Sequence, residues 1–127
     1  MTLIDRLKAA CPAQWEAFTD HQFVRQLGEG TLPLSAFQEY LVQDYLFLIQ
    51  FARANALAAY KARTLDEIRA AQAGLAGIIS ETDLHVALTG RWGISPAELN
   101  AAQEKQATVA YTRYVLDCGM VGDLLDL

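Results

Sequence analysis

The longest unbroken apolar pattern lies in residues 34–62, which contain no Gly or Pro. Apolar side chains recur there on nearly every helical turn, and this spacing predicts one long helix. Asp44 falls on the apolar face of that helix, together with Phe37, Tyr40, Leu41, Phe47, Leu48 and Phe51. Burying a bare carboxylate costs free energy, so we expect Asp44 to be hydrogen-bonded, paired with a charge, or held near its pKa for chemistry.

Shorter helices are predicted before this segment. Residues 3–10 have helical apolar spacing, and Pro12 suits the first position of a second helix. Gly28 and Gly30 mark a turn in which either glycine can take a positive φ. Pro33 is predicted to be the first residue of the long helix.

A second long helix is predicted after residue 63. Thr64 and Glu67 have the spacing of a capping box, and Gly90 is expected to end the helix that they begin. Gly74 and Gly77 lie three residues apart on one face of it. Two glycines in a helix reduce its stability, and here they would permit close approach of a neighbouring helix.

The remaining pattern is also helical. Ser95 and Glu98 flank a proline in a clear helix start, and a last helix is expected over about residues 107–118. No segment alternates with the two-residue period of a half-buried strand, so we predict an all-α helical bundle with residues 1–127 in a single domain. Residues 123–127 resemble the first turn of a further helix, which indicates a bundle truncated before its last helices.

Composition and charge narrow the function. Hydrophobic residues make up 53% of the chain and charged residues 20%, as in a folded globular protein. The net charge of −5 and the lack of a basic run argue against a nucleic-acid partner. Neither a signal peptide nor an apolar run of membrane-spanning length is visible, so we expect no membrane partner and a cytoplasmic location. The chain has two cysteines, and they lack the CxxC spacing. The sequence therefore does not suggest a disulfide framework or a zinc site.

Asp44 has two interpretations on pattern alone. It is either a buried structural acid, which caps a backbone group or pairs with Arg53 or Lys61, or a carboxylate whose perturbed environment serves binding or catalysis. Asn55 falls close to the same azimuth three turns further on and would extend a polar strip along this face.

Two histidines offer weaker candidates. Glu81 and His85 stand at i and i+4, which is either half of a metal site or a structural polar pair that satisfies itself. A di-metal carboxylate site uses Glu-x-x-His spacing and a second acid–imidazole pair, whereas the spacing differs here and His21 is the one other histidine, so we favour the structural pair and predict no metal. His21, beside a turn, is either a haem ligand or a helix cap, and the position favours the cap.

An ordered set of short motifs resembles the TenA family, the thiaminase II-like enzymes. The matching segments run in family order through the whole chain: residues 21–24, 28–33, 37–40, 43–48, 51–53, 81–85, 92–94 and 110–112. Each piece alone has low specificity, whereas the ordered set is specific.

The resemblance implies a haem-oxygenase-like helical fold without haem or other cofactor, assembled as a homotetramer. It implies hydrolysis of an aminomethylpyrimidine to the hydroxymethylpyrimidine and ammonia, in thiamine salvage, with thiamine itself as a further substrate in many members. Asp44 matches the acid that binds the pyrimidine's amino group and ring nitrogen and helps catalysis. Phe47 and Tyr111 match residues that line the substrate pocket.

Some family features differ or lie elsewhere. The family's nucleophilic cysteine follows a proline beyond residue 127, so Cys118 comes too early to fill that role, and the family's proton-donating glutamate also lies further on. Phe47 stands where some members have Tyr, and Gln22 where Pro is usual. Two other functions therefore stay open: a haem-oxygenase-like di-metal oxidase, and a non-catalytic module that binds a pyrimidine or regulates.

Overall fold

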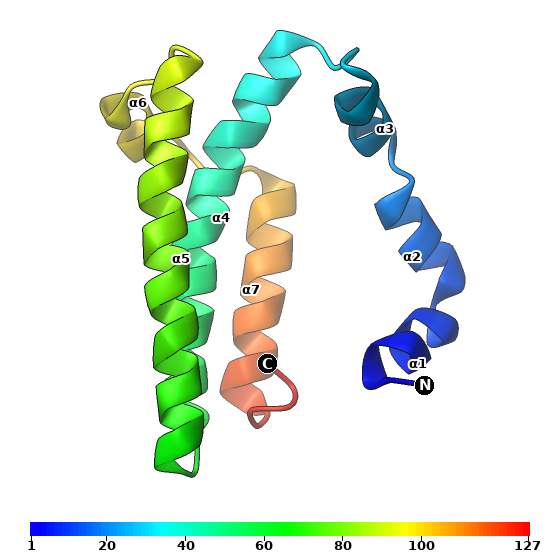
Figure 1. Ribbon diagram of the computed structural model, residues 1–127, viewed down its shortest axis with the longest axis vertical. Helices are drawn as coiled ribbons and strands as arrows, with labels where there is room; N and C mark the ends of the chain where they lie inside the picture. The colour runs from blue at the N-terminus through cyan, green and yellow to red at the C-terminus, as the bar shows by residue number, and fades with distance from the viewer. The chain divides into compact units, whose positions relative to one another are not determined.

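Seven helices and no strand make up the structure, a computed structural model that describes residues 1–127 (Figure 1). The prediction of an all-α protein is confirmed. By its internal contacts the chain divides into two compact units, residues 1–37 and residues 38–127.

The first unit contains three short helices, α1 (Leu3–Ala10), α2 (Pro12–Thr19) and α3 (Gln22–Glu29). Pro12 stands at the first position of α2, as predicted. Of the two glycines at the next turn, Gly30 takes the positive φ, at 71°, and Gly28 stays inside α3. A left-handed residue directly after a helix is the usual place for glycine, because a side chain there is strained.

Helix α4 (Leu34–Lys61) is the long helix that the apolar pattern predicted. It begins at Leu34, one residue later than expected. Pro33 is the residue before the helix, and its carbonyl oxygen accepts a hydrogen bond from the Phe37 amide at 3.1 Å. Helix α5 (Leu65–Arg91) begins with the predicted capping box of Thr64. The prediction that Gly90 ends α5 was wrong: the helix runs through Gly90, and Gly93, at φ 80°, makes the turn instead.

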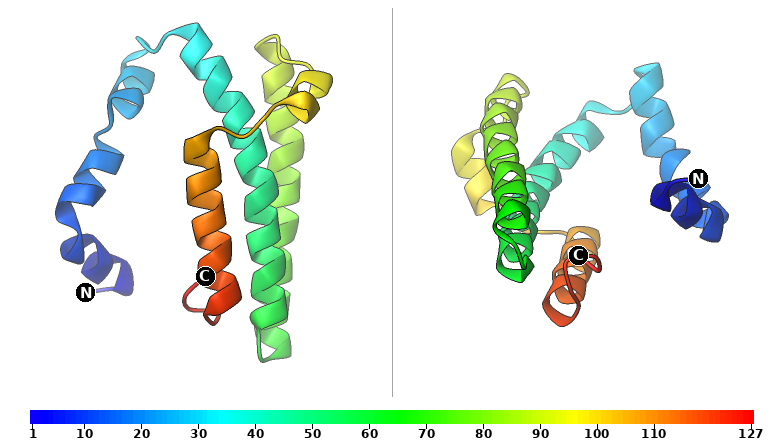
Figure 2. Two further views of the ribbon diagram at one scale, coloured as in Figure 1. Left: turned by 180° about the vertical axis from the view of Figure 1, so that it is seen from behind. Right: turned by 60° about the horizontal axis from the view of Figure 1, so that its bottom comes forward.

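Two more helices complete the second unit, α6 (Pro96–Ala101) and α7 (Gln106–Val121). Figures 1 and 2 show α4 and α5 side by side and antiparallel, with α7 beside α4 and running in the same direction. The short α6 and its flanking loops carry the chain from the end of α5 back to the start of α7. The buried apolar side chains of this unit are Leu41, Leu48, Ala54, Ile78, Ile94 and Leu99.

One of the two α5 glycines allows the close approach that the sequence predicted. A Cβ atom at Gly74 would lie 2.6 Å from Oδ1 of Asn55, so α4 and α5 could not keep this packing with a larger residue there. Gly77 has open space around it. Asn55 donates to the Phe51 carbonyl at 3.0 Å, which makes it a packing residue rather than part of a polar strip leading from Asp44.

The residues after α7 form a single turn. The Asp123 amide donates to Oδ2 of Asp126 at 2.9 Å, and the Leu125 amide to Oδ1 of Asp123 at 2.8 Å. None of the helices combines the length and the hydropathy needed to cross a membrane.

Candidate functional site

Asp44 lies on the side of α4 that faces α5, where it contacts His85. The carboxylate oxygen Oδ2 is 3.5 Å from Nδ1 of His85, and the other ring nitrogen, Nε2, is 2.8 Å from the Leu41 carbonyl oxygen. His85 is buried, with 8% of its side chain exposed, while 26% of the Asp44 side chain is exposed. Asp44 is therefore partly exposed, with an imidazole beside its carboxylate.

Burial raises the pKa of Asp44 above its ordinary value. The nearby His85 opposes this shift in the pKa, and the charge of Glu81 adds to it. Burial also raises the pKa of Tyr40, one turn earlier on α4, with the charges of Asp44 and Glu81 contributing. Perturbed groups gathered at one place are typical of functional sites, although structural pairs can show the same shifts.

The structure gives His85 a different partner from the one predicted. Both of its ring nitrogens contact α4, at Leu41 and Asp44, whereas Glu81 is exposed. The helical spacing of Glu81 and His85 placed them on one side of α5, but the buried imidazole reaches across to the neighbouring helix. The structural pair is therefore His85 with Asp44, and Glu81 acts on it through charge.

The cations considered as structural partners of Asp44 are engaged elsewhere. Arg53 donates to the side chain of Gln50 at 3.3 Å. The Lys61 ammonium donates to the carbonyl oxygens of Met120 and Gly122 at 2.8 Å each. Lys61 thus sits at the carboxyl end of α7, where a cation interacts favourably with the helix dipole.

Phe47 and Tyr111 come together on the other side of α4, against α7. Their rings stack with centroids 5.9 Å apart and planes 27° apart, and Phe47 also stacks on Phe51 at 5.4 Å. Beside them is a hollow of about 130 Å³, lined by Phe47, Gln50, Phe51, Ala54, Tyr111, Thr112, Val115 and Leu127. Ligand pockets for small molecules span roughly 300–1,000 Å³, so this hollow is smaller than such a pocket. We call the stacked rings of Phe47, Phe51 and Tyr111 the aromatic wall.

The structure thus brings together two of the three predicted pocket residues. Asp44 is one turn from Phe47 on α4, but it contacts α5 and does not line the hollow beside Tyr111. That all three contact one ligand stays a prediction. Tyr111 is 59% exposed, so its ring has a free face toward the outside of this unit.

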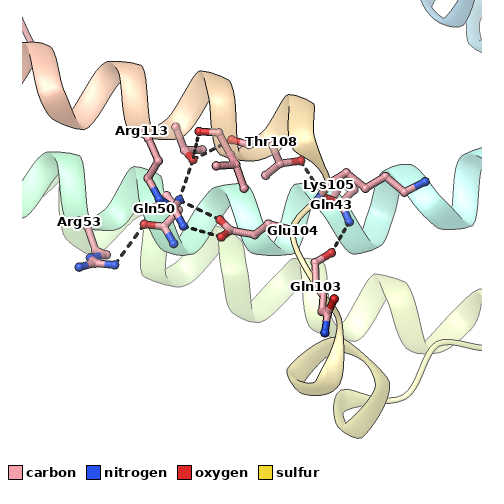
Figure 3. Close-up of polar contacts among 10 residues, drawn as sticks. Gln43, Gln50, Arg53, Gln103, Glu104, Lys105, Thr108 and Arg113 are labelled. Atoms are coloured by element: carbon pink, nitrogen blue, oxygen red, sulfur yellow. Dashed lines mark hydrogen bonds and ion pairs between the residues drawn. The ribbon is translucent and has the colours of Figure 1, made fainter.

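Gln43 lies in one of the family-like motifs without a role of its own there, and in the structure it connects α4 to the start of α7. Its Oε1 accepts hydrogen bonds from the Lys105 amide at 2.9 Å and from the Thr108 hydroxyl at 2.6 Å (Figure 3). Its Nε2 donates to the Gln103 carbonyl at 3.1 Å. An uncharged amide directly after Leu41 and Val42 was the available signal, because amides that lose contact with water generally need several partners.

A second polar contact supports the same region. Arg113 of α7 forms two parallel hydrogen bonds with the carboxylate of Glu104, one of them 3.0 Å long, and also donates to the Thr112 hydroxyl at 2.9 Å (Figure 3). The hydrogen bonds from Arg113 lower the pKa of Glu104. Thr112 is buried and directly follows Tyr111, so this contact helps to hold the aromatic wall in place.

The weaker candidates have simple structural roles here. His21 caps α3, with Nδ1 accepting from the Phe23 amide at 3.1 Å, as the turn position predicted. No three or more His, Cys, Asp or Glu side chains gather in an arrangement that could hold a metal ion.

Comparison with known proteins identifies the family. A sequence model of the TENA/THI-4/PQQC family matches residues 9–127. The chain belongs to this family. The family resemblance read from the motifs is therefore confirmed.

Individual family members match the chain at similar identity. An uncharacterized protein of Haemophilus influenzae is 42% identical over 125 residues, covering 98% of this chain and 58% of the relative. An aminopyrimidine aminohydrolase of Halalkalibacterium halodurans is 42% identical over 114 residues, covering 89% of this chain and 51% of the relative. The chain thus spans little more than half the length of these two relatives.

A solved structure from the family establishes the fold. The crystal structure of a TenA family transcription regulator from Silicibacter sp. TM1040 superimposes with a TM-score of 0.96 at 43% identity, covering 99% of this chain and 56% of that one. The chain therefore has the haem-oxygenase-like helical fold of the family, as predicted.

Proposed function

We propose that this protein hydrolyses an aminomethylpyrimidine in thiamine salvage. The products are the hydroxymethylpyrimidine and ammonia. The observation that carries the proposal is the half-buried carboxylate of Asp44, held by His85 one turn from the Phe47–Tyr111 stack. A flat heteroaromatic ring fits stacking faces, and its amino and ring nitrogens fit a carboxylate at the edge. The 42% identity to an aminopyrimidine aminohydrolase supports the same substrate class.

In the proposed reaction, Asp44 binds and polarises the pyrimidine. A carboxylate on the amidine edge helps the ring accept charge when a thiolate adds to it, and water then replaces the amine. We expect the thiolate to come from a cysteine beyond residue 127, as the family resemblance implies. Cys118 lies within α7 and is half-buried, and we assign it no catalytic role.

The test is turnover by the whole protein. Ammonia and hydroxymethylpyrimidine should appear in equal amounts from 4-amino-5-aminomethyl-2-methylpyrimidine. Asp44→Ala should weaken pyrimidine binding by roughly 10- to 100-fold, the loss expected for a charged hydrogen bond, with the fold retained. Asp66→Ala is the matched control, because Asp66 is an exposed carboxylate paired with Arg69. Unchanged affinity in Asp44→Ala would remove the role given to Asp44.

A second function has one specific observation in its favour. The Silicibacter protein, 43% identical, is described as a transcription regulator. A regulator that binds a pyrimidine without turning it over would keep Asp44 and the aromatic wall and would lack the nucleophile. The sequence after Leu127 separates the two functions: a Pro-Cys pair there supports the enzyme, and pyrimidine binding without ammonia release supports the regulator.

A di-metal oxidase would be recognised by bound metal in the whole protein. The homotetramer is likewise proposed from the family resemblance, and the mass in solution tests it.

A further inference from the structure

The contacts of His85 determine which of its nitrogens carries a proton. Nε2 lies 2.8 Å from the Leu41 carbonyl oxygen. A carbonyl oxygen can only accept, so the hydrogen of this contact belongs to Nε2. The second ring nitrogen, Nδ1, then either presents a lone pair, in the neutral ring, or donates a second N–H, in the imidazolium ion.

The partner of Nδ1 is also an acceptor when ionised. Asp44 Oδ2 is 3.5 Å from Nδ1, and a carboxylate has no hydrogen to donate. A neutral His85 facing an ionised Asp44 would therefore oppose two lone pairs in a largely buried place. One proton shared between the two groups, on Nδ1 or on the carboxyl group, removes that conflict.

We propose that His85 is the positioning residue of Asp44: locked by the Leu41 carbonyl, it shares one proton with the carboxyl group and makes it available to a ligand's ring nitrogen. The inference rests on the proposed function, because it assigns this proton to recognition of an aminopyrimidine. The edge of such a ring presents an amino donor beside a nitrogen acceptor. A carboxyl group holding one proton matches both, accepting from the amino group through one oxygen and donating from the other.

The proton count is conserved on binding. Before binding, the proton lies between His85 Nδ1 and Asp44 Oδ2. Afterwards it lies on the second Asp44 oxygen, which donates it to the ring nitrogen, so that Nδ1 faces an uncharged carboxyl group and not a carboxylate. The other titratable groups near Asp44 are Tyr40 of α4 and Glu81 of α5. A negative Glu81 favours retention of the shared proton, so its charge acts in the same direction as burial.

Three His85 variants separate its two contacts. His85→Gln keeps an amide near the Nε2 position for Leu41 and removes the titratable group that faces Asp44. His85→Asn keeps a neutral amide near Nδ1 and gives up the contact to Leu41. His85→Ala removes both contacts.

The readout is binding of 4-amino-5-hydroxymethyl-2-methylpyrimidine by the whole protein, measured by calorimetry between about pH 4 and pH 8. The wild-type affinity should fall as pH rises, because the pair then loses its shared proton. In His85→Gln only the carboxyl group can hold the proton, so the pH dependence of binding should differ from that of the wild type, with the fall in affinity at lower pH. A loss of affinity equal at every pH, in Gln and Asn alike, would show a purely structural His85 and overturn the proposal.

A second measurement needs no variant. The chain contains two histidines, so ¹⁵N spectra of the imidazoles can be assigned by comparison with His21→Gln. We expect the Nε2–H form of His85, with Nδ1 changing its signal when the pyrimidine binds; a neutral Nδ1–H form would contradict the proposal. If no pyrimidine binds at all, the proposed function fails while the spectrum still reports the tautomer. If Asp44→Ala abolishes binding and His85→Gln leaves the pH dependence of the affinity unchanged, only the proposed role of His85 fails.

Discussion

The Thr108 hydroxyl donates to Oε1 of Gln43 at 2.6 Å and thereby attaches the first turn of α7 to α4. The same oxygen accepts from the Lys105 amide, at a helix start that has no side-chain cap of its own. Gln43 therefore does from a neighbouring helix what a capping residue ordinarily does from within the chain. Because Tyr111 follows one turn later, the position of its ring depends on this amide.

Replacing Gln43 by Leu should destabilise the protein. The change removes three hydrogen bonds and leaves the Lys105 amide without its partner, which should lower the free energy of unfolding by about 1–3 kcal/mol. Chemical denaturation measures the effect. Gln103→Ala is the matched control, because Gln103 takes part only through its backbone carbonyl. Equal stabilities of the two variants would show that the Gln43 contacts contribute nothing.

Asp44→Asn should make the protein more stable at neutral pH. Burial raises the pKa of Asp44 in the folded protein above its ordinary value of 3.8. A raised folded-state pKa favours folding below the ordinary value, and that contribution is lost as pH rises through the folded-state pKa. Asparagine does not ionise, so Asp44→Asn does not lose this contribution to the free energy of unfolding as pH rises.

The measurement is the melting temperature of both proteins from pH 3.5 to pH 8, within the range in which the fold is retained. The difference in favour of Asp44→Asn should grow as pH rises. Glu104→Gln is the control with the opposite sign, since the hydrogen bonds from Arg113 lower the pKa of Glu104. Its loss of stability should be full above the ordinary Glu pKa and fade as pH falls. A constant difference across this range for Asp44→Asn would contradict the prediction.

The two glycines of α5 should respond differently to alanine. Gly77→Ala meets nothing within 4 Å and gains helix propensity, so we expect stabilisation of about 1 kcal/mol. Gly74→Ala brings a Cβ against Oδ1 of Asn55, which must rotate and lose its bond to Phe51, so the gain should be absent or reversed. Thermal unfolding of the two variants is the comparison, and adding Asn55→Ala should restore part of the gain at Gly74. Identical gains at both sites would show that the helices do not approach closely at Gly74.

A polypeptide limited to residues 1–127 should release no ammonia from an aminomethylpyrimidine. It contains the acid and the aromatic wall that we assign to substrate binding, and we expect the nucleophile elsewhere. A coupled ammonia assay with the whole protein as the positive control tests this. Turnover by a polypeptide of verified mass would mean that a group within residues 1–127 performs the nucleophilic step.

The sequence predicted the local features better than the partners across helices. The capping boxes at Thr64 and Ser95 and the proline start of α2 depend on residues close in the chain, and all are present. Gly90 was misassigned because a glycine one residue before the end of a helix is tolerated when a second glycine, Gly93, can make the turn. The partners of His85 and Gln43 were missed because periodicity places a side chain on a face without naming what faces it.

The lysine at the end of α4 has a consequence for how this stretch of the protein can change in evolution. Gln43 holds the start of α7 and Lys61 holds its end, so two segments running in the same direction are joined at both ends. The length of chain from Gln43 to Lys61 must therefore match the length from Lys105 to Gly122. A one-residue insertion or deletion in either segment should be tolerated only with a compensating change in the other.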